Sequence, residues 1–288
     1  MDKVFDYLGT IFRVILAVFL FVLSQLIVFY LFKFSGVDTT QYEGVYTTVY
    51  ALIIAVVFMI YIFVRSYKRD PLVRFQRTDG FNCLIALVIA FGLLGMVTLY
   101  TIGVQQISKY IEPVAEDMER YNDSLDRFSD VDKAVVPYWD IVLDFISTGI
   151  MIPFLEELVF RGVIYGELRT RFSIVVSIAV SSIIFGCLHG ITVHVGYALV
   201  CGAVLALVYE YSRSIWVSFT VHMFFNIFGS MLFVLLDSGI FGDMSLITYD
   251  MSLFFVVAEY LCIIPAVAGI LLLRVFYKQR INGSEAMA

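Results

Sequence analysis

The chain has 288 residues, of which 61% are hydrophobic and 15% are charged. Soluble globular domains contain roughly 45–50% apolar and about 25% charged residues, so this composition excludes a soluble globule and predicts an integral membrane protein. The net charge of −6 also excludes the basic surface on which nucleic-acid binding depends, and no nucleic-acid partner is expected.

Eight apolar stretches approach or exceed the roughly 20 helical residues that cross a bilayer core. They are continuous, whereas a closed β-barrel would need alternating segments of about ten residues. The sequence therefore predicts an all-α polytopic membrane protein with about eight transmembrane helices, in one membrane domain covering residues 1–288. The predicted spans are 12–33, 46–64, 81–104, 139–163, 173–190, 193–211, 214–236 and 252–274.

The distribution of basic residues predicts the orientation. With eight spans, 14 of the 19 Lys and Arg residues fall on the same side as the 65–80 loop. Because Lys and Arg favour the cytoplasmic side, both termini are predicted to be cytoplasmic. The opposite segment, 108–137, holds eight acidic residues and is interpreted as a solvated loop rather than a surface helix. Segment 66–80 is interpreted as a basic interfacial stretch that touches the lipid bilayer.

Ionisable residues within the spans concentrate between positions 140 and 226. A charge at the bilayer centre costs at least about 2.5–3.5 kcal/mol on insertion scales, so function is the first hypothesis for each. Glu157 and Arg161 are spaced i,i+4 and can form an ion pair on one helix face. Glu156 is left without a local counter-charge and is the candidate general base. The alternative is that both glutamates reach the cytoplasmic interface and merely end the helix.

The three histidines lie within a short part of the chain. His189 closes the fifth predicted span, and His194 lies in the following turn and is expected to have no catalytic role. His222 and Asn226 are spaced i,i+4 and share a helix face. The predicted topology allows Glu156, His189, His222 and Asn226 to meet in an intramembrane cavity.

This set of residues suits peptide-bond hydrolysis without a covalent nucleophile. A carboxylate and a histidine can share a water with the carboxylate as base, while a second histidine and an amide donate to an oxyanion. Zinc held by Glu156, His189 and His222 is the nearest alternative. It is disfavoured because the chain lacks an HExxH helix and the carboxylate would be used up as a ligand, so no metal cofactor is predicted. Serine or cysteine catalysis is disfavoured because no GxSxG elbow exists.

Three motifs carry a resemblance to a known family. EELVFRG (156–162), FGCLH (185–189) and HMFFN (222–226) resemble the EExxxR, FxxxH and HxxxN motifs of the CPBP family. This family contains the CAAX-prenyl-protease and bacteriocin-processing intramembrane endopeptidases and is also called the Abi family. The resemblance covers residues 139–236, which are predicted to form the catalytic core helices.

The resemblance implies a glutamic intramembrane protease with eight helices. It implies that Glu156 activates the hydrolytic water with His189, and that His222 and Asn226 form the oxyanion hole. Glu157 and Arg161 resemble the motif positions that support the site.

The resemblance also implies a membrane-associated peptide or protein substrate, either prenylated or bearing a leader. The absence of long loops and of an organellar targeting segment favours a multi-pass protein of a bacterial plasma membrane. Two other functions remain open: a non-catalytic bacteriocin-immunity or partner-binding membrane protein, and a small transporter with a Glu/His proton relay. Transporters usually show internal repeats and paired broken helices, and neither is evident here.

Overall fold

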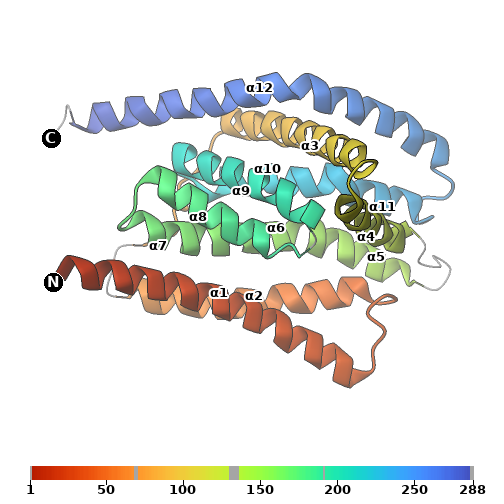
Figure 1. Cartoon of the computed structure of the whole chain (residues 1–288), viewed down its shortest axis with the longest axis horizontal. Coiled ribbons are helices and arrows are strands. Elements are labelled where there is room, and N and C mark those ends of the chain that lie inside the picture. Colours follow the sequence, from red (N-terminus) through yellow and green to blue (C-terminus); the bar gives the residue numbers. More distant parts are fainter. Residues whose placement is uncertain (1, 68–70, 130–135, 191, 286–288) are drawn as a thin grey trace.

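The computed structural model describes residues 2–67, 71–129, 136–190 and 192–285. Within these ranges the chain consists of helices and short connections, with one isolated β-bridge, which confirms the all-α prediction. Figure 1 shows the helices in layers, with α1 and α2 on one side of the central helices and α3 and α12 on the other.

Two central helices are continuous although they change geometry along their length. Residues 138–169, here called the core helix, and residues 215–237 both contain turns of wider π-helix, labelled η. The first part of the chain forms α1 (Asp2–Ser35), α2 (Glu43–Ser66), α3 (Gly80–Ser108) and α4 (Glu112–Ser129). The core helix comprises α5 (Tyr138–Ile146), η1 (Ser147–Met151), α6 (Ile152–Glu156), η2 (Glu157–Tyr165) and α7 (Gly166–Arg169). The remainder forms α8 (Ile174–Cys187), α9 (Thr192–Ser212), α10 (Ile215–Asn226), η3 (Ile227–Met231), α11 (Leu232–Asp237) and α12 (Ser245–Glu285).

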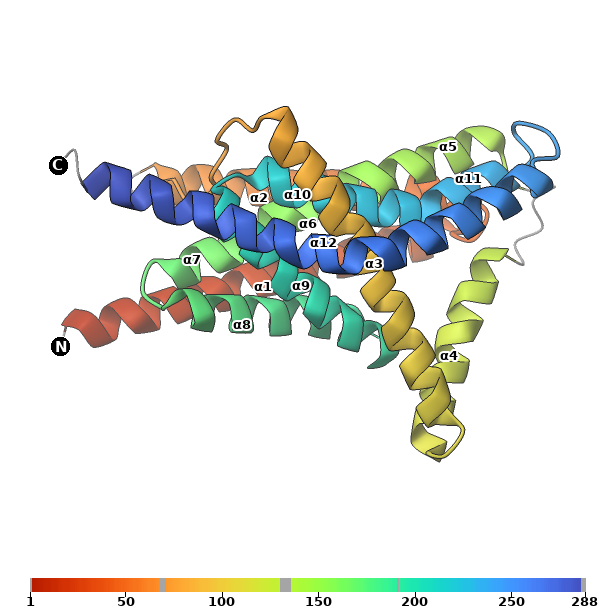
Figure 2. The same ribbon diagram turned by 90° about the horizontal axis from the view of Figure 1, so that it is seen from above.

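Helices occupy all eight ranges predicted to span the membrane, but they do not all qualify as spans by length and composition. In the described residues, six helices are long and apolar enough to cross a bilayer. Helix α8 has only 14 residues, and the core helix carries buried charges. The count of eight therefore stays a prediction. Both termini lie at the same end of the molecule (Figures 1 and 2), as an even number of passes requires, and the cytoplasmic assignment of that end stays a prediction.

Helix α1 shows why these helices suit a bilayer. Its buried residues recur every three or four positions and so form one stripe along the helix that faces the protein. Large apolar side chains such as Phe12 and Phe19 are exposed on the other faces, where lipid would surround them. The buried stripe comprises Thr10, Val14, Ala17, Phe21, Ser24 and Val28.

Small residues allow α3 and α12 to pack closely. A Cβ atom at Gly92 would lie 2.3 Å from the Cβ of Ala266, and one at Gly95 would lie 2.6 Å from the carbonyl oxygen of Glu259. Glycine lets helix backbones approach closely in a membrane, where van der Waals packing drives association. Helix α3 is thereby held at a tilt across α12 (Figure 2).

The prediction of a solvated loop for residues 108–137 was wrong over most of its length. Residues 112–129 form α4, which packs against α3 and α9, whereas residues 130–135 lie outside the described residues. Met118 is buried, and Val114, Ala115 and Tyr121 are half-buried. Their helical spacing gives the acidic segment one apolar side, so it can pack as a helix while Glu112, Glu116 and Glu119 are exposed.

The interpretation of segment 66–80 as an interfacial stretch also needs correction. Leu72 and Val73 are buried in the protein core, and Phe75 forms a β-bridge with Ser214. The hydroxyl of Ser214 donates to the carbonyl of Gln76 at 2.6 Å. The described part of this segment therefore docks onto the protein, because Leu72 and Val73 pack in the core and its backbone groups find hydrogen-bond partners there.

Candidate active site

The core helix positions the first motif through a change in its winding. Glu156 is the last residue of α6, and Glu157 begins the π-helical segment η2, all nine residues of which are buried. A π-helical turn is wider than an α-helical one and occurs frequently at functional sites. The two adjacent glutamates consequently enter different surroundings.

Glu157 lies at the centre of a buried ion-pair network. Its side chain has no exposed surface, and its Oε1 lies 2.9 Å from Nη1 of Arg161. Nδ1 of His222 lies 3.0 Å from the same oxygen. The predicted i,i+4 pair between Glu157 and Arg161 is confirmed, and His222 is a further partner. A carboxylate paired with a guanidinium is ionised, so the histidine nitrogen is the donor in this contact.

Glu156 lies beside this network and borders a cavity of about 220 Å³. The carboxylate keeps 16% of its side-chain surface exposed, and its Oε2 lies 3.6 Å from Nε2 of His222. The prediction that Glu156 has no local counter-charge was therefore incomplete. A protonated His222 would supply one from helix α10, a contact between distant segments that spacing within one helix could not reveal.

All four predicted catalytic residues line this one cavity. Glu156 comes from α6, His189 from the turn after α8, and both His222 and Asn226 from α10. The cavity lies where the two apolar clusters of the core meet, because its wall includes members of both. Its other lining residues are Leu93, Ile152, Phe185, Tyr197, Ala198, Cys201, Leu205, Val221 and Phe225.

His189 and Asn226 are each held by a backbone carbonyl. Nδ1 of His189 lies 2.7 Å from the carbonyl oxygen of Phe185, and Nδ2 of Asn226 donates to the carbonyl of Thr148 at 3.2 Å. Since a carbonyl only accepts, Nδ1 of His189 carries a proton, and a neutral ring presents an unprotonated Nε2. Asn226 retains a second N–H for another acceptor.

Phe185 links the three motifs, which sequence reasoning did not anticipate. The guanidinium carbon of Arg161 lies 4.5 Å from the centre of its ring, and the rings of His189 and His222 lie 4.4 and 6.0 Å away. A guanidinium over an aromatic face is attracted by the ring quadrupole. Arg161 also donates to the carbonyl of Gly202 at 3.3 Å, which anchors the core helix to α9. Tyr197 and Cys201 were also missed, because nothing in their local sequence separates them from other residues of an apolar span.

His194 does not line this cavity, and its lack of a catalytic role stays a prediction. It belongs to the first turn of α9 rather than to a loop, and its ring contacts Tyr121 and Tyr197. Its contacts join α4 to α9.

A bound metal ion would need several ligand side chains grouped around one point. In the ranges that the structure describes, no three His, Cys, Asp or Glu side chains are grouped so as to hold a metal ion. In particular, both nitrogens of His222 face carboxylates, those of Glu156 and Glu157. The set Glu156, His189 and His222 does not form a zinc site in this arrangement.

Comparison with known proteins agrees with these motifs. Residues 138–228 match the family model described as type II CAAX prenyl endopeptidase Rce1-like. The chain is 29% identical over 136 residues to a protein of Bacillus subtilis (strain 168) named "Putative membrane peptidase YdiL". This alignment covers 47% of the chain and 56% of the relative, so the chain spans about half the length of the curated relative that it matches. No solved structure matches the chain.

The region matched by the family model contains all three motifs and most of the cavity wall. The bacterial relative and the six apolar helices agree with a multi-pass membrane protein of bacterial type. Over this region, the chain is similar to the CAAX-prenyl-protease-like endopeptidases, the family that its three motifs resemble.

Proposed function

We propose that this protein is an intramembrane endopeptidase that hydrolyses a peptide bond with a water activated by Glu156. The observation that carries the proposal is the meeting of Glu156, His189, His222 and Asn226 around one cavity inside the helical bundle. The match to a prenyl endopeptidase model and a relative named as a membrane peptidase supports the same reaction class.

In the proposed reaction, the Glu156 carboxylate accepts a proton from water while the water oxygen bonds to the scissile carbonyl carbon. His189, fixed by its contact with Phe185, orients this water through Nε2. The tetrahedral intermediate then collapses, the C–N bond breaks, and the proton held by Glu156 passes to the leaving amine. One water is consumed, and one carboxyl and one amino end are formed.

The oxyanion of the intermediate would receive hydrogen bonds from Asn226 and His222. Asn226 can donate its second N–H, since the first is bound to the Thr148 carbonyl. His222 donates Nδ1–H to Glu157, so it can donate from Nε2 only when both ring nitrogens carry protons. Glu157 and Arg161 act in this proposal as positioning residues.

The proposed substrate is a membrane-associated peptide or protein, either prenylated or bearing a leader. The description of the family model, a CAAX prenyl endopeptidase, supports a prenylated substrate. The site is bordered by Phe185, Phe225 and several aliphatic residues, which suits a peptide segment of apolar character.

The test is cleavage of membrane-tethered and prenylated peptides by the purified full-length protein. Glu156→Gln keeps the shape of the side chain but cannot accept the proton, and we expect a loss of rate of about 100-fold or more. The matched control is Glu259→Gln, which changes a buried glutamate of α12 that does not line the cavity. Equal rates for wild type and folded Glu156→Gln would refute the proposal.

A strong chelator distinguishes the metal-free reaction from the zinc-dependent alternative. We expect cleavage by the wild type to be unchanged after chelation. Loss of cleavage that added zinc restores would instead assign the site to zinc held by Glu156, His189 and His222. Binding of a peptide without cleavage, unaffected by Glu156→Gln, would favour the non-catalytic immunity or partner-binding function.

A further inference from the structure

Two cavities outside the candidate active site lie side by side at the end of the molecule that holds both termini. One, of about 730 Å³, is an apolar groove between α1 and α2. The other, also about 730 Å³, has five arginines in its wall and is here called the basic cavity. Arg13 and Arg65 line both cavities, and neither cavity shares a lining residue with the one around Glu156.

The apolar groove matches a hydrocarbon chain. From Arg13 it extends along α1 to Leu20, and from Arg65 along α2 to Val57. At 1.5 Å per residue these distances are roughly 10 Å and 12 Å, directed away from the charged end and into the apolar part of the bundle. Its remaining lining residues are Leu16, Ile60, Tyr61, Val64 and Tyr67.

Glu167 pairs with two of the arginines at once. Its buried carboxylate lies 2.8 Å from Nε of Arg13 and 2.5 Å from Nε of Arg65. One carboxylate thus serves two guanidinium groups. Nη1 of Arg65 is buried and has no hydrogen-bond partner in the described structure, although 11% of this side chain remains exposed.

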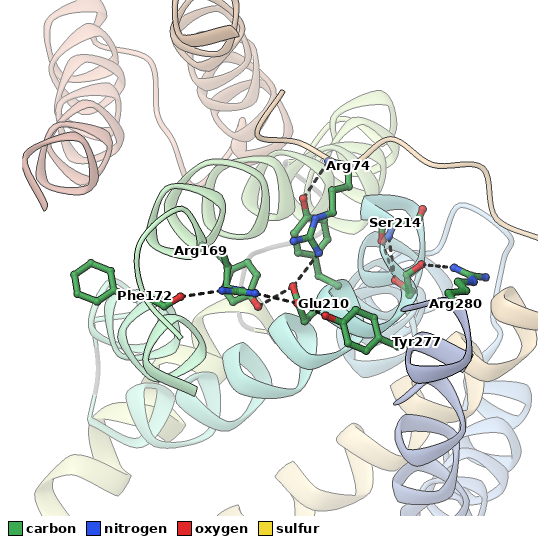
Figure 3. A network of polar contacts seen from close by, with 10 residues as sticks. Arg74, Arg169, Phe172, Glu210, Ser214, Tyr277 and Arg280 are labelled. Carbon is green, nitrogen blue, oxygen red and sulfur yellow. Dashed lines mark hydrogen bonds and ion pairs between the residues drawn. The ribbon is translucent and has the colours of Figure 1, made fainter. Parts of the chain in front are cut away.

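The same imbalance recurs around Glu210, which pairs with two further arginines that line the basic cavity (Figure 3 shows these contacts). Its carboxylate contacts Arg74 at 2.8 Å and Arg169 at 3.5 Å, and it accepts a hydrogen bond from Tyr277 at 3.1 Å. Nε of Arg169 is buried without a partner in the described structure. Burial opposes the charge of Arg74, but the Glu210 carboxylate holds the pKa of Arg74 above its ordinary value. The Arg74 guanidinium therefore remains charged.

The charges of the whole cluster do not cancel. The fifth arginine, Arg171, pairs with Asp6 at 2.8 Å. Five arginines thus stand against three carboxylates, Asp6, Glu167 and Glu210, which leaves two positive charges within the described residues. Buried guanidinium N–H groups without acceptors cost free energy, and a bound anion would supply the missing oxygens.

We propose that Arg13, Arg65 and the neighbouring arginines bind the phosphate group of an anionic phospholipid whose acyl chain lies in the α1–α2 groove. Guanidinium groups match phosphate oxygens with paired hydrogen bonds. The non-bridging oxygens of the phosphate can accept the guanidinium hydrogen bonds that lack an acceptor, and its negative charge offsets part of the excess. The adjoining apolar groove explains why the phosphate belongs to a lipid: one molecule with a charged head and a hydrocarbon chain fills both cavities. The cytoplasmic leaflet, which the arginine-rich end is predicted to face, carries anionic lipid.

The test is native mass spectrometry of the full-length protein in detergent, titrated separately with dioctanoyl phosphatidylglycerol, dioctanoyl phosphatidylcholine and inorganic phosphate. We expect phosphatidylglycerol to bind about tenfold more tightly than phosphatidylcholine, because both carry the phosphate but the choline cation cancels its charge beside the excess arginines. Inorganic phosphate should bind far more weakly than phosphatidylglycerol, because it cannot use the groove.

Two variants test the arginine cluster and the apolar groove separately, and a third is their control. Arg13→Lys with Arg65→Lys preserves the positive charges beside Glu167 but removes the forked donors, and should weaken phosphatidylglycerol by about tenfold. Leu20→Trp narrows the groove and should weaken phosphatidylglycerol while leaving inorganic phosphate unchanged. Lys33→Gln, an exposed basic residue at the other end of α1, is the control and should bind like the wild type.

Specific outcomes would overturn the proposal. Equal affinity for the two lipids would refute the selection of an anionic head group by the excess positive charge of the arginines. Insensitivity to both the lysine variant and Leu20→Trp would place lipid binding elsewhere. Tighter binding of inorganic phosphate than of phosphatidylglycerol, or one-for-one displacement of phosphatidylglycerol by a prenylated peptide, would assign the cavities to a free anion or to substrate.

Discussion

Replacing Arg161 with glutamine tests whether Arg161 and Glu157 form a coupled, buried ion pair that stabilises the protein. Glu157 has no exposed surface and Arg161 only 2%, and their charged atoms lie 2.9 Å apart. Removal of one partner from a buried ion pair costs about 3–5 kcal/mol, because the other charge stays buried and uncompensated. The Arg161→Gln variant also loses the contact with the Phe185 ring, worth about 0.5–2 kcal/mol. We therefore expect its free energy of unfolding to fall by at least about 3 kcal/mol.

A double-mutant cycle separates the ion pair from these other losses. Glu157→Gln combined with Arg161→Gln leaves no uncompensated charge, so the double variant should be more stable than the sum of the single effects by about 1–3 kcal/mol. The assay is reversible unfolding in detergent micelles followed by circular dichroism. Arg120→Gln removes an exposed arginine from an ion pair on α4 and should cost less than about 1 kcal/mol. Additivity of the two buried substitutions within about 0.5 kcal/mol would refute the account of Glu157 and Arg161 as a coupled pair.

Two further predictions concern the packing and capping of helices, with thermal unfolding as the measurement. Gly92→Ala should destabilise the protein by about 1–3 kcal/mol, because its Cβ would lie 2.3 Å from that of Ala266. Gly103→Ala, with open space around it, should be neutral or stabilising, and similar losses for both variants would contradict close packing of α3 on α12. Asp140→Ala should cost about 1–2 kcal/mol, because the carboxylate accepts from the backbone N–H of Gly44 at 2.9 Å and caps the start of α2. Asp140→Asn, which keeps an acceptor, should recover part of that stability, and no difference between the two variants would argue against capping.

Hydropathy and helical spacing predicted the parts of the structure that depend on local sequence. The apolar stretches are helical, and the i,i+4 spacings correctly indicated that Glu157 pairs with Arg161 and that His222 and Asn226 line the same cavity. These contacts arise within one helix, where periodicity determines which side chains share a face. Whether the three motifs can meet depends on how the spans are connected. The order of spans predicted from hydropathy was enough to show that they can.

Contacts between segments distant in the sequence could not be predicted from hydropathy and helical spacing. The contact of His222 with both glutamates depends on how α10 packs against the core helix, which spacing within either helix does not specify. The π-helical turns that begin at Ser147, Glu157 and Ile227 also have no pattern in the sequence that separates them from α-helix. Each adds to the turn a residue that only tertiary packing stabilises.

The docking of segment 71–79 was missed for a related reason. Its basic residues suggested a membrane surface, but its backbone groups bind those of the α9–α10 connection, as in the 2.9 Å bond from the Ile215 N–H to the Arg74 carbonyl. Val73 packs against Gly162, where a Cβ would lie only 2.9 Å from the valine side chain. Counting charges along the sequence cannot predict that Val73 packs against Gly162 of the core helix.

The core helix carries three glutamates, and their partners separate their chemical roles. Glu157 and Glu167 are fully buried and contact arginines, so accepting a proton would sacrifice strong ion pairs in a medium that screens them little. Glu156 differs in both respects, since its carboxylate keeps some exposure at a cavity and its neighbour is the imidazole of His222 instead of a guanidinium. A general base must exchange a proton in every turnover, and a permanently charged partner would oppose that exchange. Among the glutamates of this helix, these contacts therefore favour Glu156 as the proposed base, while its neighbour Glu157, paired with Arg161, contacts His222.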